Sequence, residues 1–167
     1  MPVGLKVHFR DDGLDEQLAD LAARVVRREP AMAEIGGELQ ASTDQRFRDE
    51  RGPGGEAWPE LAPATLIGRA GKKARTKSGG FSKRARTRMS NAKILRDTGE
   101  LFNSISFQAT ANEVAVGTNK RYARIQQLGG RTGRGNQVEI PARPFLGISD
   151  DDRGTIADIL SSHLEGR

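Results

Sequence analysis

Residues 105–118 read ISFQATANEVAVGT and contain two alternating runs that decide the fold. Ile105, Phe107 and Ala109 alternate with polar residues, and two valines repeat the pattern after an Ala-Asn pair. A period of two is typical of a strand with one buried face, and the pair between the runs suits a hairpin turn. The stretch therefore predicts two antiparallel strands.

Helical patterns flank this hairpin on both sides. Apolar residues recur at spacings of three and four, which is typical of helices with one buried face. A Gly36-Gly37 pair weakens the longest helix by about 1 kcal/mol per glycine, and close packing against a neighbour would explain it. The class is therefore α+β: a small antiparallel sheet packed with a long helix and flanking helices. Before the hairpin we also predict a strand at residues 3–9, a helix ending near Arg28, a helix from Pro30 to Phe47, irregular chain at 51–62 anchored by Trp58, a helix at 63–70, and a helix followed by a strand start at 94–105. After the hairpin we predict a helix at 122–128 and an edge or bend at 138–148. A last helix begins at Ser149, with Ile156, Ile159, Leu160 and Leu164 facing inward.

Composition excludes several classes of protein. The chain has 167 residues, 35% of them hydrophobic, which fits one domain over residues 1–167 with a modest core. It has no cysteine and two histidines, so thiol catalysis and thiolate metal sites are excluded. Charges interrupt every apolar stretch, so we expect no membrane span and no export signal.

Positive charge is concentrated in one segment. Residues 69–96 contain eleven Lys or Arg and no acid, whereas the rest of the chain has 16 basic and 22 acidic residues. Because like charges repel, we expect residues 71–92 to form a basic flexible loop or arm, with a second basic loop at 131–136. The candidate DNA- or partner-contacting residues are Arg69, Lys72, Lys73, Arg75, Lys77, Lys83, Arg84, Arg86, Arg88, Lys93, Arg131 and Arg134. Contact with DNA phosphates and docking on an acidic protein are both open.

Three short patterns resemble catalytic or ligand-binding motifs. Asp97-Thr98-Gly99 is the tripeptide of aspartic proteases, but its charged neighbours favour a helix break or cap. The glycine-rich stretches lack the spacing of a phosphate-binding loop. Residues 150–152 are three aspartates that suit a helix cap better than a cation site. We therefore expect no enzymatic activity, no metal and no cofactor.

Four sequence blocks together are similar to one known family. They are residues 94–105 (ILRDTGELFNSI), 114–119 (VAVGTN), 122–130 (YARIQQLGG) and 140–148 (IPARPFLGI). Their order and spacing closely resemble the phage virion morphogenesis, or tail completion, family of tailed phages, including Mu-like ones, and residues 52–66 fit as well. Gln126 departs from the pattern, since many members have His there. The motif residues implied are Trp58, Leu95, Asp97, Thr98, Gly99, Leu101, Ser104, Ile105, Gly117, Tyr122, Ala123, Gly129, Gly130, Pro141, Arg143, Pro144 and Phe145.

The resemblance implies a structural virion protein of the head-tail junction, made in the host cytoplasm and active in no catalysis. It implies a homo-oligomeric ring around the DNA channel, with six copies expected and twelve as the alternative. The implied partners are neighbouring neck, connector and tail terminator or tail tube proteins, and packaged DNA is a further candidate. For the ring contact we expect the edge at residues 138–148 and the first two helices. The competing hypothesis is a sequence-nonspecific DNA-binding protein that acts through residues 69–96.

Overall fold

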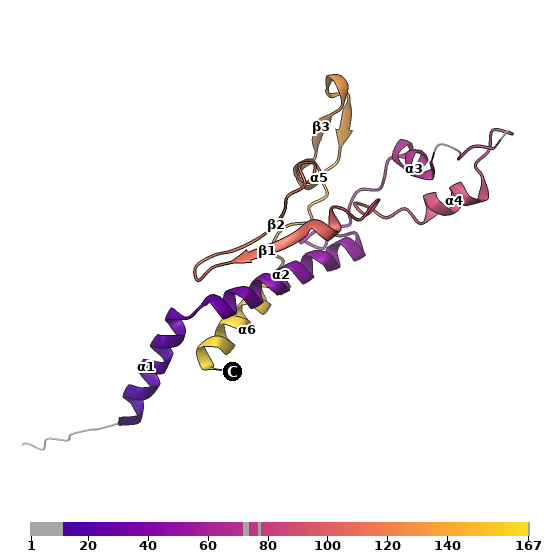
Figure 1. The fold of residues 1–167 in the computed structure, drawn as a ribbon. Helices are drawn as coiled ribbons and strands as arrows, with labels where there is room; N and C mark the ends of the chain where they lie inside the picture. The colour runs from indigo at the N-terminus through magenta and orange to yellow at the C-terminus, as the bar shows by residue number, and fades with distance from the viewer. Residues whose placement is uncertain (1–11, 72–73, 77, 167) are drawn as a thin grey trace, which may run out of the picture.

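An α+β fold is present: within the described part of the chain, six helices accompany two short antiparallel hairpins (Figure 1). The computed structural model describes residues 12–71, 74–76 and 78–166. The helices are α1 (Asp12–Val26), α2 (Glu29–Asp49), α3 (Pro63–Ala70), α4 (Lys83–Ser90), α5 (Ala123–Leu128) and α6 (Asp150–Glu165). The strands are β1 (Ile105–Ala109), β2 (Val114–Thr118), β3 (Gly130–Thr132) and β4 (Val138–Ile140), with 3-10 turns η1 (Phe102–Ser104) and η2 (Arg134–Asn136). The predicted fold class is confirmed.

The long helix α2 is the element on which the body packs. Pro30 lies in its first turn, where a missing N–H costs nothing, and Glu50 ends it in a left-handed conformation with φ 57°. The β1–β2 hairpin and α6 both pack against α2. A Cβ added at Gly36 would lie within 2.9 Å of three ring atoms of Phe107, whereas Gly37 faces open space. Close packing therefore explains the first glycine of the pair.

The β1–β2 hairpin has the predicted strands and turn. Ile105 lies opposite Thr118, and Phe107 lies opposite Val116. The Thr110 N–H donates to the carbonyl of residue 113 at 2.8 Å, which closes the turn. Burial alternates along β1, so one face packs on α2 and the other faces solvent.

Aromatic side chains form the main core between α2 and the loops that follow it. Phe47 and Phe145 are fully buried, and Trp58 is nearly so. The Phe47 ring meets the Trp58 ring edge-on at a centroid distance of 5.5 Å and lies 5.3 Å from the Phe145 ring. Such pairs contribute about 0.5–1.5 kcal/mol each beyond burial. Trp58 is therefore the predicted anchor of the irregular residues 51–62.

The terminal helices meet at one end of the molecule. Ser149 caps α6 as expected, and Ile159 is buried against Ala31 and Ile35 of α2. Leu164, predicted to face inward, is exposed, because α6 extends past the end of the packed body. The predicted α1 is confirmed, and Figure 1 shows it projecting away from α2 beside the C-terminal end of α6.

The predicted helix within residues 94–105 is wrong. The chain turns there instead, with Leu95 at φ 57° and Gly99 at φ 80°, and only η1 is helical. Left-handed backbone at these two positions interrupts helical hydrogen bonding. Asp97-Thr98-Gly99 consequently lies in an exposed turn and not at a helix end.

Two basic segments predicted as loops contain regular structure. Residues 83–90, within the segment expected to be a flexible loop or arm, form α4. Residues 131–136 lie in the β3–β4 hairpin, whose turn has Gly133 at φ 81° and Gly135 at φ 70°. β4 ends just before Pro141, which has no N–H to continue a ladder. The strand predicted at residues 3–9 lies outside the described residues.

Candidate interaction surfaces

The described part of the basic segment folds as a helical arm, which we define as the described residues within 63–90, with α3 and α4 side by side (Figure 1). Ala70, Ala74 and Ala85 are buried between the two helices, and Phe81 and Met89 pack against them. Ser82 caps α4 by accepting a hydrogen bond from the Ala85 N–H at 3.2 Å. Alanines permit a close helix approach with few large apolar residues, which is why the sequence pattern missed α4.

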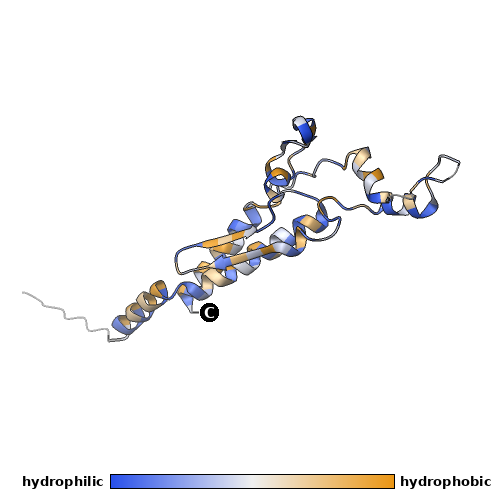
Figure 2. Cartoon of the chain, turned by 45° about the horizontal axis from the view of Figure 1, so that its top comes forward, coloured by the Kyte–Doolittle hydropathy of each residue, from blue (hydrophilic) through white to orange (hydrophobic). Residues whose placement is uncertain are grey.

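The arm keeps most of its positive charge in solvent. Lys83, Arg84, Arg86 and Arg88 on α4 are exposed, and none forms an ion pair with another described residue. Arg75 lies over the Phe81 ring at 5.4 Å. Figure 2 shows α4 as one of the more hydrophilic parts of the chain. Three further candidate residues, Lys72, Lys73 and Lys77, lie outside the described residues.

The remaining predicted cations lie elsewhere. Arg69 is only partly exposed, pairs with Asp97 at 3.5 Å and donates to the Lys93 carbonyl at 2.6 Å. Lys93 itself lies 3.9 Å from Glu50 at the end of α2. These contacts fasten the arm to the body. Arg131 and Arg134 are exposed on the β3–β4 hairpin, apart from the arm.

A cleft of about 570 Å³ lies between the base of the arm and the β3–β4 hairpin. Its walls are Leu61 and Ala64 on the arm side and Val138 and Ile140 on the hairpin side. The structure brings eight of the motif residues to this cleft, namely Leu95, Asp97, Thr98, Gly99, Leu101, Tyr122, Pro141 and Arg143. Gln126 also lines it with a neutral side chain. The motif residues therefore include residues that line a surface cleft as well as residues of the core.

Arg143 is buried at the floor of this region. Its Nε donates to the Pro59 carbonyl and its Nη2 to the Glu60 carbonyl, each at 2.8 Å. Burial, with a smaller effect from the charge of Arg69, lowers the pKa of the Arg143 guanidinium from its ordinary value. Arg143 therefore fixes the chain that enters the arm. It acts through hydrogen bonds to two adjacent carbonyls.

The other motif residues are structural. Trp58 donates from Nε1 to the Pro144 carbonyl at 2.8 Å, and Ser104 hydrogen-bonds Thr118 across the hairpin. A Cβ at Gly129 would lie 2.8 Å from the Ala142 N. Gly117 lies in β2, and Gly130 begins β3 with φ 137°. The remaining three, Ile105, Ala123 and Phe145, are buried in the core.

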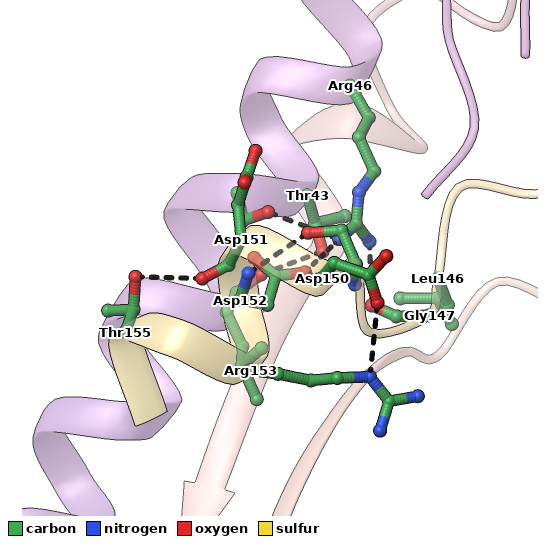
Figure 3. A network of polar contacts seen from close by, with 12 residues as sticks. Thr43, Arg46, Leu146, Gly147, Asp150, Asp151, Asp152, Arg153 and Thr155 are labelled. Atoms are coloured by element: carbon green, nitrogen blue, oxygen red, sulfur yellow. Dashed lines mark hydrogen bonds and ion pairs between the residues drawn. The ribbon is translucent and has the colours of Figure 1, made fainter. Parts of the chain in front are cut away.

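A buried polar network joins α2 to α6 (Figure 3). Arg46 forms an ion pair with Asp152 and donates to the Gly147 carbonyl at 2.8 Å. Asp152 also accepts the Ser149 N–H at 2.7 Å and so completes the predicted helix cap. Burial opposes its ionisation, but hydrogen bonds with Ser42 and Ser149 and the Arg46 charge together hold the pKa of Asp152 below its ordinary 3.8.

Arg46 is the polar residue that sequence reasoning missed. It lies on the α2 stripe that also carries Leu39, Thr43 and Phe47, all partly or fully buried. A charged residue on the buried stripe of a helix needs a partner, and this was the available signal. Among the described residues, no group of His, Asp or Glu is arranged to hold a metal ion.

None of the described helices is both long and apolar enough to span a bilayer.

Comparison with known proteins agrees with the motif and the fold. The model of the phage virion morphogenesis family matches residues 10–165. The chain is also 33% identical over 148 residues to the Mu-like prophage FluMu G protein 2 of Haemophilus influenzae, covering 89% of this chain and 86% of that protein. No solved structure matches. The chain belongs to the phage virion morphogenesis family, and its role is in phage structure and assembly.

Proposed function

We propose that this protein is a structural component of the phage head-tail junction, where copies form a ring that joins or completes the tail. In this role it catalyses no reaction. Its partners are neighbouring neck, connector and tail proteins, with the DNA passage running through the ring. Membership of the virion morphogenesis family over nearly the whole chain supports the phage setting.

One structural observation supports a ring: three segments project from a small body, and the body does not pack over them. They are α1, the arm and the β3–β4 hairpin, which leave the body in different directions (Figure 1). Val26, Leu128 and Val138 on or near these projections are strongly exposed. Exposed apolar surface on an extended chain favours association with other subunits. A ring needs two different surfaces on each copy, and these projections supply them.

The predicted ring contact changes in one respect. The β4 edge and α1 remain available, as expected from the sequence. Helix α2, however, is covered by β1 and α6 over much of its length. We therefore assign the contact to α1, the arm and the hairpin rather than to the first two helices together.

The test is the location of the protein in phage particles. We expect purified virions to contain it between capsid and tail, and a deletion phage to accumulate heads and tails that do not join. The control is Asp97→Asn, which removes the carboxylate of the protease-like tripeptide but leaves an amide oxygen able to accept a hydrogen bond from Arg69, so joining should be unaffected. Infectious particles from the deletion strain, or virions lacking the protein, would contradict this function.

Sequence-nonspecific DNA binding is the second candidate, favoured by the exposed cations of α4, which form no ion pair with a described residue. Phosphate contacts would give an affinity that falls steeply with salt. Replacing Lys83, Arg84, Arg86 and Arg88 with Ser would then abolish DNA binding. Under the ring proposal the same variant instead fails to join heads to tails.

A further inference from the structure

Helix α1 carries an apolar stripe that the described chain leaves open. Leu14, Leu18, Leu21 and Val25 are 50%, 54%, 41% and 48% exposed. Their spacing of four, three and four residues puts them on one face of the helix. Four large apolar side chains in one exposed row are more than scattered surface residues.

The contacts that hold α1 to the body are polar and lie at its C-terminal end. Arg24 donates from Nη1 to the Leu164 carbonyl at 2.9 Å, and His163 Nε2 lies 3.0 Å from the Arg24 carbonyl. These contacts fix the direction of α1 without burying its stripe. Figure 2 shows the resulting apolar residues on a helix that extends beyond the body.

The same helix is acidic. Residues 12–26 contain four acids and one base, a net charge of −3. Asp20 pairs with Arg24 within the helix, but Asp15 and Glu16 are exposed and form no ion pair with a described residue. A partner for the stripe should therefore be apolar at its centre and basic at its rim.

The arm at the opposite end of the molecule has these properties (Figures 1 and 2). Ile67 on α3 is 40% exposed, and Leu66 beside it is half-buried. The cations of α4, Arg84 and Arg86 among them, are exposed and unpaired among the described residues. Acidic α1 and the basic arm are thus complementary but too far apart to meet within one chain.

We propose that α1 of one copy docks on the α3–α4 arm of the next copy, with its leucine stripe against α3 and its acids against α4. This contact rests on the proposed ring and names its interface. Pairing α1 with α1 would oppose like charges, and so would pairing arm with arm. Of these three pairings the mixed contact is the one that opposes unlike charges, and it is the heterologous kind from which rings are built.

Cross-linking tests this arrangement directly, because the chain contains no cysteine. Full-length Leu18→Cys and Ile67→Cys proteins are mixed and treated with a flexible bis-maleimide. We expect a covalent dimer in the mixture and little in either variant alone. Ser161→Cys, exposed on α6, replaces Leu18→Cys in the matched control and should not couple to Ile67→Cys. No dimer in the mixture, or an equal dimer from Leu18→Cys alone, would overturn the proposal.

Charge exchange provides a second, independent measurement. Asp15→Lys with Glu16→Lys, or Arg84→Glu with Arg86→Glu, should each weaken self-association by about tenfold or more in sedimentation velocity. Mixing the two double variants should restore pairing between the reversed surfaces. Asp158→Lys, an exposed acid on α6, serves as the control.

Several results of this measurement would overturn the contact. They are a wild-type chain that stays monomeric at all concentrations, reversed charges that leave association unchanged, and an arm reversal that lowers only the affinity for a DNA duplex. The last result would favour the DNA-binding role. None of these results would contradict the proposed position at the head-tail junction, because that position is tested separately on phage particles.

Discussion

Arg46 and Asp152, 106 residues apart in the chain, form a buried ion pair that joins the last third of α2 to the first turn of α6. The guanidinium also donates to the Phe145 carbonyl at 3.2 Å and to the Gly147 carbonyl, so the loop before α6 is held as well. Both side chains are less than a tenth exposed. This pair therefore sets the position of α6, and through His163 and Leu164 the direction of α1.

Removing one member of this pair should destabilise the fold strongly. Arg46→Met leaves the Asp152 carboxylate buried without its charged partner, which costs about 3–5 kcal/mol in comparable cases. Urea denaturation followed by circular dichroism measures the loss. Arg48→Met, an exposed cation on the same helix, is the control and should change the free energy of unfolding by less than about 0.5 kcal/mol. Equal effects from the two substitutions would refute a stabilising role for the pair.

The same carboxylate makes stability depend on pH. Because the pKa of Asp152 is lowered in the folded state, the unfolded chain binds its proton at higher pH than the folded chain does. Its contribution to the free energy of unfolding is fully present above the ordinary value of 3.8 and is lost as the pH falls through the folded value. We expect Asp152→Asn to have a shallower decline of stability below about pH 5 than the wild type. Identical slopes in acid titrations would contradict this assignment.

The two glycines of α2 should respond to alanine in opposite directions. Gly36→Ala places a methyl group where it overlaps the Phe107 ring, and overpacking of this kind costs about 1–3 kcal/mol. Gly37→Ala meets open space and gains helix propensity, which stabilises by about 0.5–1 kcal/mol. Thermal unfolding of the two variants side by side measures the difference. A stabilised Gly36→Ala protein would mean that β1 does not pack this closely on α2.

Periodicity predicted the elements that carry apolar residues along one face. The β1–β2 hairpin, α1, α2 and α6 all follow from spacings of two or of three and four residues. It failed where few large apolar residues carry the packing. Helix α4 contacts α3 through Ala85, and the turn at Leu95 depends on a left-handed backbone that leucine rarely adopts.

The sequence predicted which residues the candidate surfaces contain but not how these residues are arranged in space. Charge counting identified the arm, and the motif blocks identified residues that meet at one cleft. Which cations remain free is a tertiary property, since Arg69 is paired with Asp97 while Arg84 is not. The sequence also could not predict that the stripe on α1 stays exposed, because amphipathic spacing indicates an apolar face but not what packs against it.

Arg143 should be irreplaceable by lysine, although the charge is the same. Its Nε and Nη2 reach two adjacent carbonyls, those of Pro59 and Glu60, and a single ammonium lacks this forked geometry. One of the two carbonyls would lose its donor, at a cost of about 0.5–1.5 kcal/mol. Arg143→Lys should therefore lower the free energy of unfolding in urea and speed hydrogen exchange at the Thr65 and Leu66 amides, which donate to the Ala62 carbonyl where the chain enters the arm. The control is Arg131→Lys, at an exposed position on β3, which should change neither quantity. If Arg143→Lys also changed neither, the two hydrogen bonds from the Arg143 guanidinium would not fix the arm.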